Sequence, residues 1–218
     1  MKRLIVIALA GLFVVLVLRC LAGARTAHVM TFAGDSIMQG IGSTSEANTV
    51  VGRLTSLKPH WYIRNYSFGG ASVSGGGGFS AMDPSAVAKL LGDTIVVFLG
   101  TNDWNNEIGE STFKTNYSNF ISSLESLHPL IVCVTPIWRS DEGTKNKAGY
   151  TIATLRADIR TICTRARHPV IDGLTLVPNN PSYYAYWRGP FIHPNDDGYA
   201  SYAANLSKAL GALIQQER

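Results

Sequence analysis

The chain has 218 residues, of which 46% are hydrophobic and 16% are charged, and its formal net charge is +4. Aromatic and aliphatic residues continue to the C-terminus, so the composition is not that of a disordered protein. Part of the positive charge lies near the N-terminus and no run of basic residues follows it, so we expect no nucleic-acid partner.

Residues 1–24 have the pattern of a secretory signal peptide. Two basic residues precede an unbroken apolar stretch over residues 4–18, and small residues at positions 22–24 permit cleavage. The stretch is shorter than the roughly 20 residues of a membrane span. An uncleaved membrane anchor is the alternative, because Arg19 interrupts the neutral run towards the cleavage site. We therefore expect an exported protein, periplasmic or secreted, that is either released or anchored through residues 4–18.

Residues 28–218 are expected to form one domain with a single sizeable core. Short apolar runs alternate with longer amphipathic stretches. Strands are predicted at 29–33, 61–66, 94–99, 130–134 and 169–172, and helices at 46–57, 85–91, 111–127, 148–166 and 196–214. This alternation predicts an α/β fold in which right-handed βαβ units build a parallel sheet covered on both faces.

Cys133 and Cys163 are the only cysteines beyond the leader. In an oxidising compartment they are able to pair, although two cysteines do not make a disulfide scaffold. Cys133 lies in the apolar run 130–134, and a small core residue is a better interpretation of it than a catalytic nucleophile.

Sheets of this kind bind ligands beyond the carboxyl ends of their strands, so the segments that follow the strands belong together. They are Gly34-Asp35-Ser36, Phe68-Gly69-Gly70 with a mobile glycine-rich loop at 74–78, Gly100-Thr101-Asn102-Asp103, Thr135-Pro136, and the segment from Asp172 to His193.

Each of these segments is weak evidence for a functional site when it is considered alone. Ser36 lies at a strand-to-loop turn that presents a hydroxyl to a cleft, but Gly-Asp-Ser is also ordinary turn chemistry. Asn102 and Gly70 offer an amide side chain and an unobstructed backbone N–H to a developing oxyanion, yet both also suit a turn or a helix cap. His193 is one of five histidines.

Taken together, the segments resemble the four sequence blocks of the SGNH/GDSL hydrolases. The resemblance extends over essentially the whole chain from His28 onwards, and the blocks have the order typical of that family. The matching residues are Gly34-Asp35-Ser36, then Asn65 with Gly70, then Gly100-Thr101-Asn102-Asp103, then His193-Pro194-Asn195.

The resemblance implies a three-layer α/β/α sandwich around a mostly parallel, flavodoxin-like sheet of five strands. It implies hydrolysis of esters or thioesters by Ser36 as nucleophile and His193 as general base, without a metal or cofactor. The Ser36 N–H, Gly70 and Asn102 would form the oxyanion hole. The implied mechanism is that of the serine triad, although this chain lacks the Gly-x-Ser-x-Gly motif found around the nucleophile of other serine hydrolases.

The chain departs from the family at one position. The family usually has an aspartate three residues before the histidine, where this chain has Pro190, whose side chain accepts no hydrogen bond. Three interpretations stay open: a Ser-His dyad with a backbone carbonyl holding His193, a substitute acid such as Asp172, or a degraded site that only binds. Retention of the other site residues favours a working enzyme.

The aromatic run at 183–187 lies in a long loop over residues 173–191, and loops of this length tend to be functional. Its side chains suit either stacking on sugars and lining an acyl pocket, or packing on the core beneath His193. Trp104 and Trp138-Arg139 are expected to line the same cleft.

The sequence thus predicts an exported serine ester hydrolase that acts on a carbohydrate O-acetyl or small acyl ester. Its partner would be a small-molecule or glycan ester substrate, with membrane contact only through the N-terminal segment. The alternatives are an O-acetyltransferase that uses the same acyl-Ser36 intermediate, and a non-catalytic glycan-binding domain.

Overall fold

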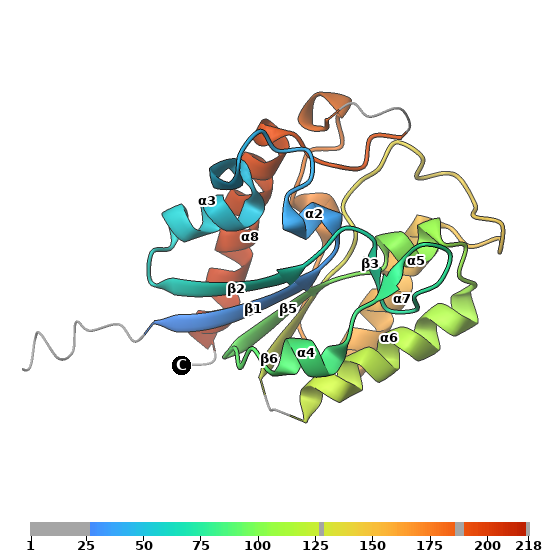
Figure 1. Cartoon of the computed structure of the whole chain (residues 1–218), viewed down its shortest axis with the longest axis horizontal. Helices are drawn as coiled ribbons and strands as arrows, with labels where there is room; N and C mark the ends of the chain where they lie inside the picture. Colours follow the sequence, from blue (N-terminus) through green and yellow to red (C-terminus); the bar gives the residue numbers. More distant parts are fainter. Residues whose placement is uncertain (1–26, 127–128, 186–189, 217–218) are drawn as a thin grey trace, which may run out of the picture.

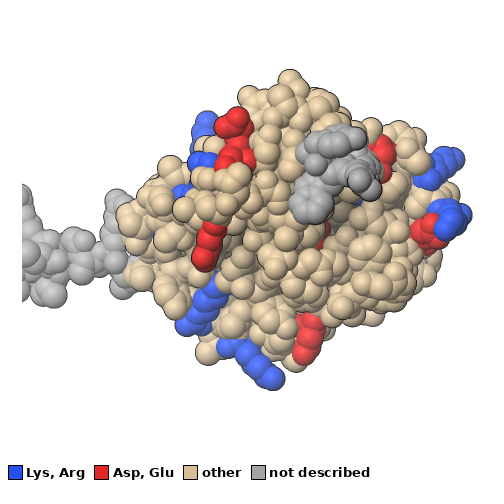
Figure 2. Space-filling model, turned by 45° about the horizontal axis from the view of Figure 1, so that its top comes forward, with Lys and Arg blue, Asp and Glu red and all other residues tan. Residues whose placement is uncertain are grey.

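The structure is a computed structural model that describes residues 27–126, 129–185 and 190–216. The predicted signal peptide or anchor at 1–24 lies outside these residues. Within the described ranges, no helix combines the length and the apolar character that crossing a bilayer requires. On the face shown in Figure 2, acidic and basic side chains are spread over the surface and uncharged residues cover most of it.

The core of the fold is a five-stranded sheet in which every neighbouring pair of strands is parallel. The strand order is β2(Trp61–Ser67), β1(His28–Gly34), β5(Thr94–Phe98), β6(Leu130–Val134), β7(Val170–Ile171). In order along the chain this is the 2-1-3-4-5 arrangement of flavodoxin-like sheets. The predicted fold class and the five predicted strands are confirmed.

Helices cover both faces of the sheet (Figure 1). Helices α3(Val50–Leu57) and α8(Asp196–Gln216) pack against each other on one side, and α4(Pro84–Ala88), α6(Glu110–Glu125) and α7(Ile152–Arg165) form the layer on the other. Because both faces are covered, the strands are apolar in near-continuous runs instead of alternating with polar residues. The predicted three-layer sandwich is therefore confirmed.

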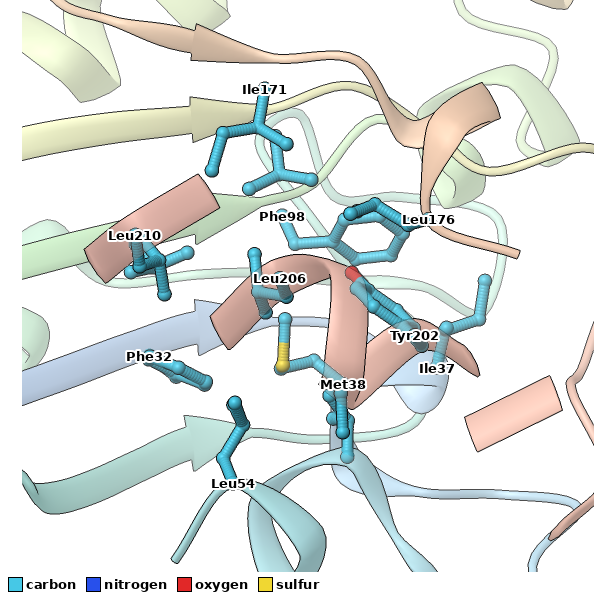
Figure 3. Packing of buried hydrophobic residues seen from close by; sticks show 14 of the residues in the cluster. Phe32, Ile37, Met38, Leu54, Phe98, Ile171, Leu176, Tyr202, Leu206 and Leu210 are labelled. Atoms are coloured by element: carbon cyan, nitrogen blue, oxygen red, sulfur yellow. The ribbon is translucent and has the colours of Figure 1, made fainter. Parts of the chain in front are cut away.

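Successive strand residues supply two separate apolar clusters, as the two-residue period of a strand requires. In β5, Val96 and Phe98 belong to the cluster under α3 and α8, whereas Ile95 and Val97 belong to the cluster under α6 and α7. Figure 3 shows the first cluster, in which Leu206 and Leu210 of α8 and Leu54 of α3 lie against strand residues such as Phe32.

Two predicted helices begin later than expected because threonine side chains cap them. Residues 46–48 form the 3₁₀ turn η1(Glu46–Asn48), and Thr49 then accepts a hydrogen bond from Gly52 N–H and starts α3. Thr151 caps α7 in the same way through Thr154 N–H. In each case a threonine in an extended conformation satisfies an end group of the helix, which the hydrophobic periodicity does not reveal.

Several short elements were not predicted. They are α2(Ser36–Gln39), α5(Thr101–Asn105), the two-stranded parallel sheet of β3(Ala71–Ser72) and β4(Ser80–Ala81), and the 3₁₀ turns η2(Gly173–Thr175) and η3(Pro181–Tyr183). Most of them lie just after strands, where they determine how the functional residues are presented.

Cys133 and Cys163 form a disulfide that joins the sheet to the layer of α6 and α7. Cys133 is on β6, Cys163 is on α7, and both side chains are completely buried. Cys133 is thus the core residue that its sequence context indicates, and it is also cross-linked. The bond holds α7 against the strand that leads into the cleft.

We expect reduction of this disulfide to lower the free energy of unfolding by about 2–4 kcal/mol, because the closed loop restricts the unfolded chain. Urea unfolding with and without dithiothreitol measures the difference. The Cys163→Ala variant should unfold at the same urea concentration in both conditions. Unfolding of the wild type that is insensitive to the reductant would contradict the prediction.

Candidate active site

The functional segments meet where the strand order reverses, between β1 and β5. The chain leaves β1 towards β2 on one side and later returns to β5 on the other. Helix α2 begins directly after β1 and helix α5 follows β5, so the ends of these two connections diverge and leave a crevice between them. Ser36 is the first residue of α2 and Asn102 lies in α5. The topology alone therefore brings these two residues to one place.

Ser36 is fixed by the capping of α2. The side chain of Asp35 accepts a hydrogen bond from Ile37 N–H at 2.9 Å, and Ile37 and Met38 are buried in the core beneath. The Tyr199 hydroxyl of α8 lies 2.9 Å from the carbonyl oxygen of Ile37. The serine thus stands on a short helix that is held from below by the C-terminal helix.

His193 reaches Ser36 from the other end of the chain. Ser36 Oγ and His193 Nε2 are 2.9 Å apart, the distance of a hydrogen bond between a nucleophile and its base. The histidine backbone is held because Ala185 N–H donates to the His193 carbonyl oxygen at 2.9 Å. Gly42 permits this closure, since a Cβ at that position would lie 2.4 Å from Pro194 O.

The environment of His193 favours the neutral imidazole. Burial lowers the pKa of His193 below its usual value of 6.5, and the positive charge of Arg139 lowers it further. A neutral ring is able to accept the proton of Ser36 through Nε2, which is the requirement for a general base near neutral pH.

Asp35, next to the nucleophile, is completely buried. Its Oδ2 atom has no hydrogen-bond partner among the described residues. Burial raises the pKa of Asp35 to about 7, and the negative charge of Asp103 contributes in the same direction. The carboxyl group is therefore partly protonated near neutral pH, while its other oxygen continues to cap α2.

Gly70 and Asn102 lie together at the carboxyl ends of β2 and β5. Asn102 Nδ2 donates to the carbonyl oxygen of Ala71, the residue after Gly70, at 2.9 Å. Gly70 has a φ of +77°, which favours glycine, and a Cβ there would meet nothing closer than 3.6 Å. The pairing of Ser67 with Gly34 in the sheet brings the start of this turn beside the Ser36 segment.

The glycine-rich segment after Gly70 is hydrogen-bonded to residues of α5 and its C-terminal cap. The buried carboxylate of Asp103 accepts hydrogen bonds from Val73 N–H at 3.1 Å and Ser74 N–H at 3.0 Å. Asn106 Nδ2 donates to Gly75 O at 2.6 Å. The side chains of the Gly-Thr-Asn-Asp segment thus hold the turn that carries Gly70.

The described residues line a cavity of about 460 Å³, whose wall contains sequence neighbours of the site residues but not Ser36, Gly70, Asn102 or His193 themselves. Trp104 and Asn105 of α5 form one part of its wall, and Ile192, directly before His193, forms another. Arg139 and Phe79 also lie in its wall, and its other residues are mostly polar or charged. Trp104 and Arg139 line this cavity, whereas Trp138 packs against Tyr184 at a ring-centre distance of 5.2 Å.

Asp172 was considered from the sequence as a partner of His193, but its hydrogen bonds in the structure go to other residues. Its Oδ1 accepts a hydrogen bond from Leu174 N–H at 3.1 Å, which caps η2, and its Oδ2 is 2.9 Å from Arg160 Nη2. The described contacts of Asp172 do not include His193. The geometry thus offers no support for Asp172 as the acid that orients the histidine, and Pro190 supplies no carboxylate.

In the described part of the aromatic run before His193, the side chains pack on the core. Tyr184 is buried, and residues Tyr184 and Pro194 form an isolated β-bridge beside His193. The second half of the run, Tyr186 and Trp187, lies outside the described residues. In the described part of the chain, no group of three or more His, Cys, Asp or Glu side chains is placed to hold a metal ion.

Comparison with known proteins agrees with this architecture. The model of the GDSL-like lipase/acylhydrolase family matches residues 32–201. No curated protein matches the chain in sequence.

Solved structures resemble the fold at low sequence identity. The acetyl xylan esterase AlAXEase is 18% identical over 84% of this chain and 99% of its own, with a TM-score of 0.64. The psychrotrophic esterase EstA from Pseudoalteromonas sp. is 12% identical over 86% of this chain and 99% of its own, with a TM-score of 0.65. The salicylyl-acyltransferase SsfX3 from a tetracycline biosynthetic pathway is 18% identical over 88% of this chain but 56% of its own, with a TM-score of 0.70.

We expect the imidazole of His193 to protonate with a midpoint below pH 6.5, because burial and Arg139 both disfavour the cation. The unfolded chain takes up this proton more readily, so the contribution of His193 to stability falls as the pH drops below 6.5. A proton NMR titration measures the midpoint, with the resonance assigned by its loss in His193→Gln. A midpoint at or above 6.5 would show that the environment does not favour the neutral ring.

Proposed function

Because the chain belongs to the GDSL-like lipase/acylhydrolase family, we propose that it hydrolyses a carbohydrate O-acetyl ester or another small acyl ester through an acyl-Ser36 intermediate. The observation that carries the proposal is the 2.9 Å contact between Ser36 Oγ and His193 Nε2, at the end of the sheet where Gly70 and Asn102 follow their strands. A nucleophile, a base and two potential oxyanion donors are the parts that acyl transfer requires.

In the first half of the reaction, His193 Nε2 takes the proton of the Ser36 hydroxyl as Oγ attacks the carbonyl carbon. The negative oxygen of the tetrahedral intermediate accepts hydrogen bonds from the backbone N–H groups of Ser36 and Gly70 and from Asn102 Nδ2. The imidazolium then gives its proton to the alcohol oxygen, the ester bond breaks and the acyl group stays on Ser36.

In the second half, a water oxygen attacks the carbonyl carbon of the acyl-enzyme while His193 takes a proton from that water. The imidazolium returns this proton to Ser36 Oγ when the acid leaves. Pro190 and the partners of Asp172 favour a Ser-His dyad or a non-standard triad over the family's usual arrangement. Loss of an orienting carboxylate slows such enzymes by on the order of 10⁴, but the oxyanion hole still acts.

The polar cavity supports a hydroxylated substrate. Lys145 and Asn146 in its wall are suited to hydrogen bonding, and Phe79 offers aromatic surface. A sugar presents both hydroxyl groups and apolar faces, so it suits such a wall better than a long hydrocarbon chain does. The fold of an acetyl xylan esterase makes acetylated glycans the first substrates to test.

Export is part of the proposal and has separate support. The disulfide between Cys133 and Cys163 is of a kind that persists in oxidising compartments, and residues 1–24 have the pattern of a signal peptide. An intact mass lacking the leader, measured on protein recovered from the periplasm or medium of an exporting host, would support cleavage. A full-length mass in the membrane fraction would instead indicate an anchor.

We expect Ser36→Ala to lower the rate of p-nitrophenyl acetate hydrolysis by at least about 10³-fold, because the reaction loses its nucleophile. The same assay on acetylated xylan, read as released acetate, tests the glycan substrate. Ser56→Ala is the matched control, since this serine of α3 is exposed and bonds only to its own helix.

The outcomes separate the alternatives. Equal inactivity of the wild type and Ser36→Ala on all of these esters would leave only a binding domain. Faster transfer of acetyl to an added sugar than to water would identify an O-acetyltransferase that uses the same intermediate.

A further inference from the structure

Asn102 is held by a chain of hydrogen bonds that continues well beyond the site. Its Oδ1 accepts a hydrogen bond from Asn105 Nδ2 at 3.3 Å. Asn105 Oδ1 in turn accepts a hydrogen bond from Arg139 Nη1 at 2.9 Å. The two asparagines are three residues apart in α5, so they share one face of the helix.

Arg139 itself is immobilised at the far end of this chain. Its side chain is 3% exposed and forms an ion pair with Asp141 through both Nε and Nη2. The guanidinium carbon also lies 4.4 Å from the ring centre of Trp104. A planar group held on two sides by a carboxylate and an aromatic ring has one orientation available for its remaining N–H groups.

The chemical nature of these groups determines which atom donates and which accepts in each hydrogen bond from Arg139 to Asn102. A guanidinium has donors only, so Asn105 must turn its carbonyl oxygen towards Arg139 and its NH₂ group towards Asn102. Asn102 must then present its oxygen to Asn105 and its NH₂ group to the other side. One of these N–H groups bonds to Ala71 O, and in the proposed mechanism the second donates to the substrate.

This direction matters because an amide has two orientations of nearly equal shape. If the side chain of Asn102 turned over, it would place a carbonyl oxygen where the negative oxygen of the intermediate develops. The interaction would become repulsive instead of stabilising, and an oxyanion donor contributes about 10²–10³ in rate. Selection between the two orientations therefore affects the reaction rate.

We propose that Arg139 and Asn105 are positioning residues for the oxyanion hole, in which the obligate donor Arg139, acting through Asn105, and the obligate acceptor Ala71 O together fix the amide orientation of Asn102. The inference rests on the proposed function, since it assigns Asn102 the role of oxyanion donor. It adds two residues to the site beyond the nucleophile and the base.

The most direct test is Asn105→Asp. The aspartate has the same shape and still accepts from Arg139, but it has no N–H to offer to Asn102 Oδ1. The kcat for p-nitrophenyl acetate should fall about 10-fold or more while KM changes less than about 2-fold, because a transition-state interaction is weakened and ground-state binding is not. Arg139→Lys is the second variant: it keeps the positive charge but loses the planar fork.

A double-mutant cycle separates positioning from general damage. If Asn105 and Arg139 act through Asn102, their substitutions should have almost no further effect on kcat in an Asn102→Ala background. Equal losses of kcat in the wild-type and Asn102→Ala backgrounds would overturn the inference. So would an unchanged kcat in Asn105→Asp.

Two controls complete the design. Arg53→Lys breaks a chemically matched bond, in which Arg53 Nη2 donates to Asn48 Oδ1 at 2.9 Å, and it should leave kcat unchanged. In Arg139→Lys the acidic limb of the pH–kcat/KM profile should stay within about 0.3 pH units, because the charge near His193 is retained. A large shift of that limb would mean that Arg139 acts on the base instead of on Asn102.

Failure of the proposed function is recognised separately by covalent labelling of Ser36 with diethyl p-nitrophenyl phosphate, followed by mass spectrometry. A wild type that is neither labelled nor hydrolytic would overturn the proposed function and this inference with it. A wild type that is labelled and active, but whose Asn105 and Arg139 variants show additive losses with Asn102→Ala, would overturn this inference alone.

Discussion

The hydrogen bond between Ser36 and His193 joins residues that are 157 positions apart, and the rest of the structure serves to make that contact reproducible. Neither residue belongs to a strand. The serine depends on the capping of α2 by Asp35, and the histidine depends on a segment paired with residues 183–185. Both supports rest on the same apolar cluster beneath α8. The parallel sheet, with both faces buried, is the rigid part of the fold. Short capped segments at the carboxyl ends of its strands then hold the functional side chains in position.

A second set of interactions organises the opposite side of the crevice. Asp103 and Asn106 of the α5 segment hold the glycine-rich turn, whereas Asn102 faces the site and Asn105 connects it to Arg139. In the proposed mechanism, one short segment therefore orders both the backbone donor at Gly70 and the side-chain donor at Asn102. The nucleophile and base are supported from the α8 side of the sheet, and these two oxyanion donors from the α6 and α7 side.

The fold was predictable because its strands are buried on both faces, which gives uninterrupted apolar runs, and because βαβ units have one favoured hand. The positions of Ser36, Gly70, Asn102 and His193 followed from strand ends and family motifs. Local side-chain bonds were harder to predict. Thr49 interrupts a periodic stretch that otherwise suits a single helix, and Asp172 has a capping and ion-pair role that its place at the sheet edge does not reveal. The chain from Arg139 to Asn102 depends on contacts between residues far apart in sequence, and no spacing rule indicates it.

Tyr199 has a consequence for how the protein matures. Its hydroxyl lies 2.9 Å from Ile37 O and 2.8 Å from Ile41 O, so a residue near the end of the chain closes the turn that presents a serine near the beginning. A chain that is still being synthesised lacks both this tether and His193. Long-range contacts of this kind form only after the intervening chain is available to close the loop. Ser36 and His193 therefore come together only when synthesis of the domain is nearly complete.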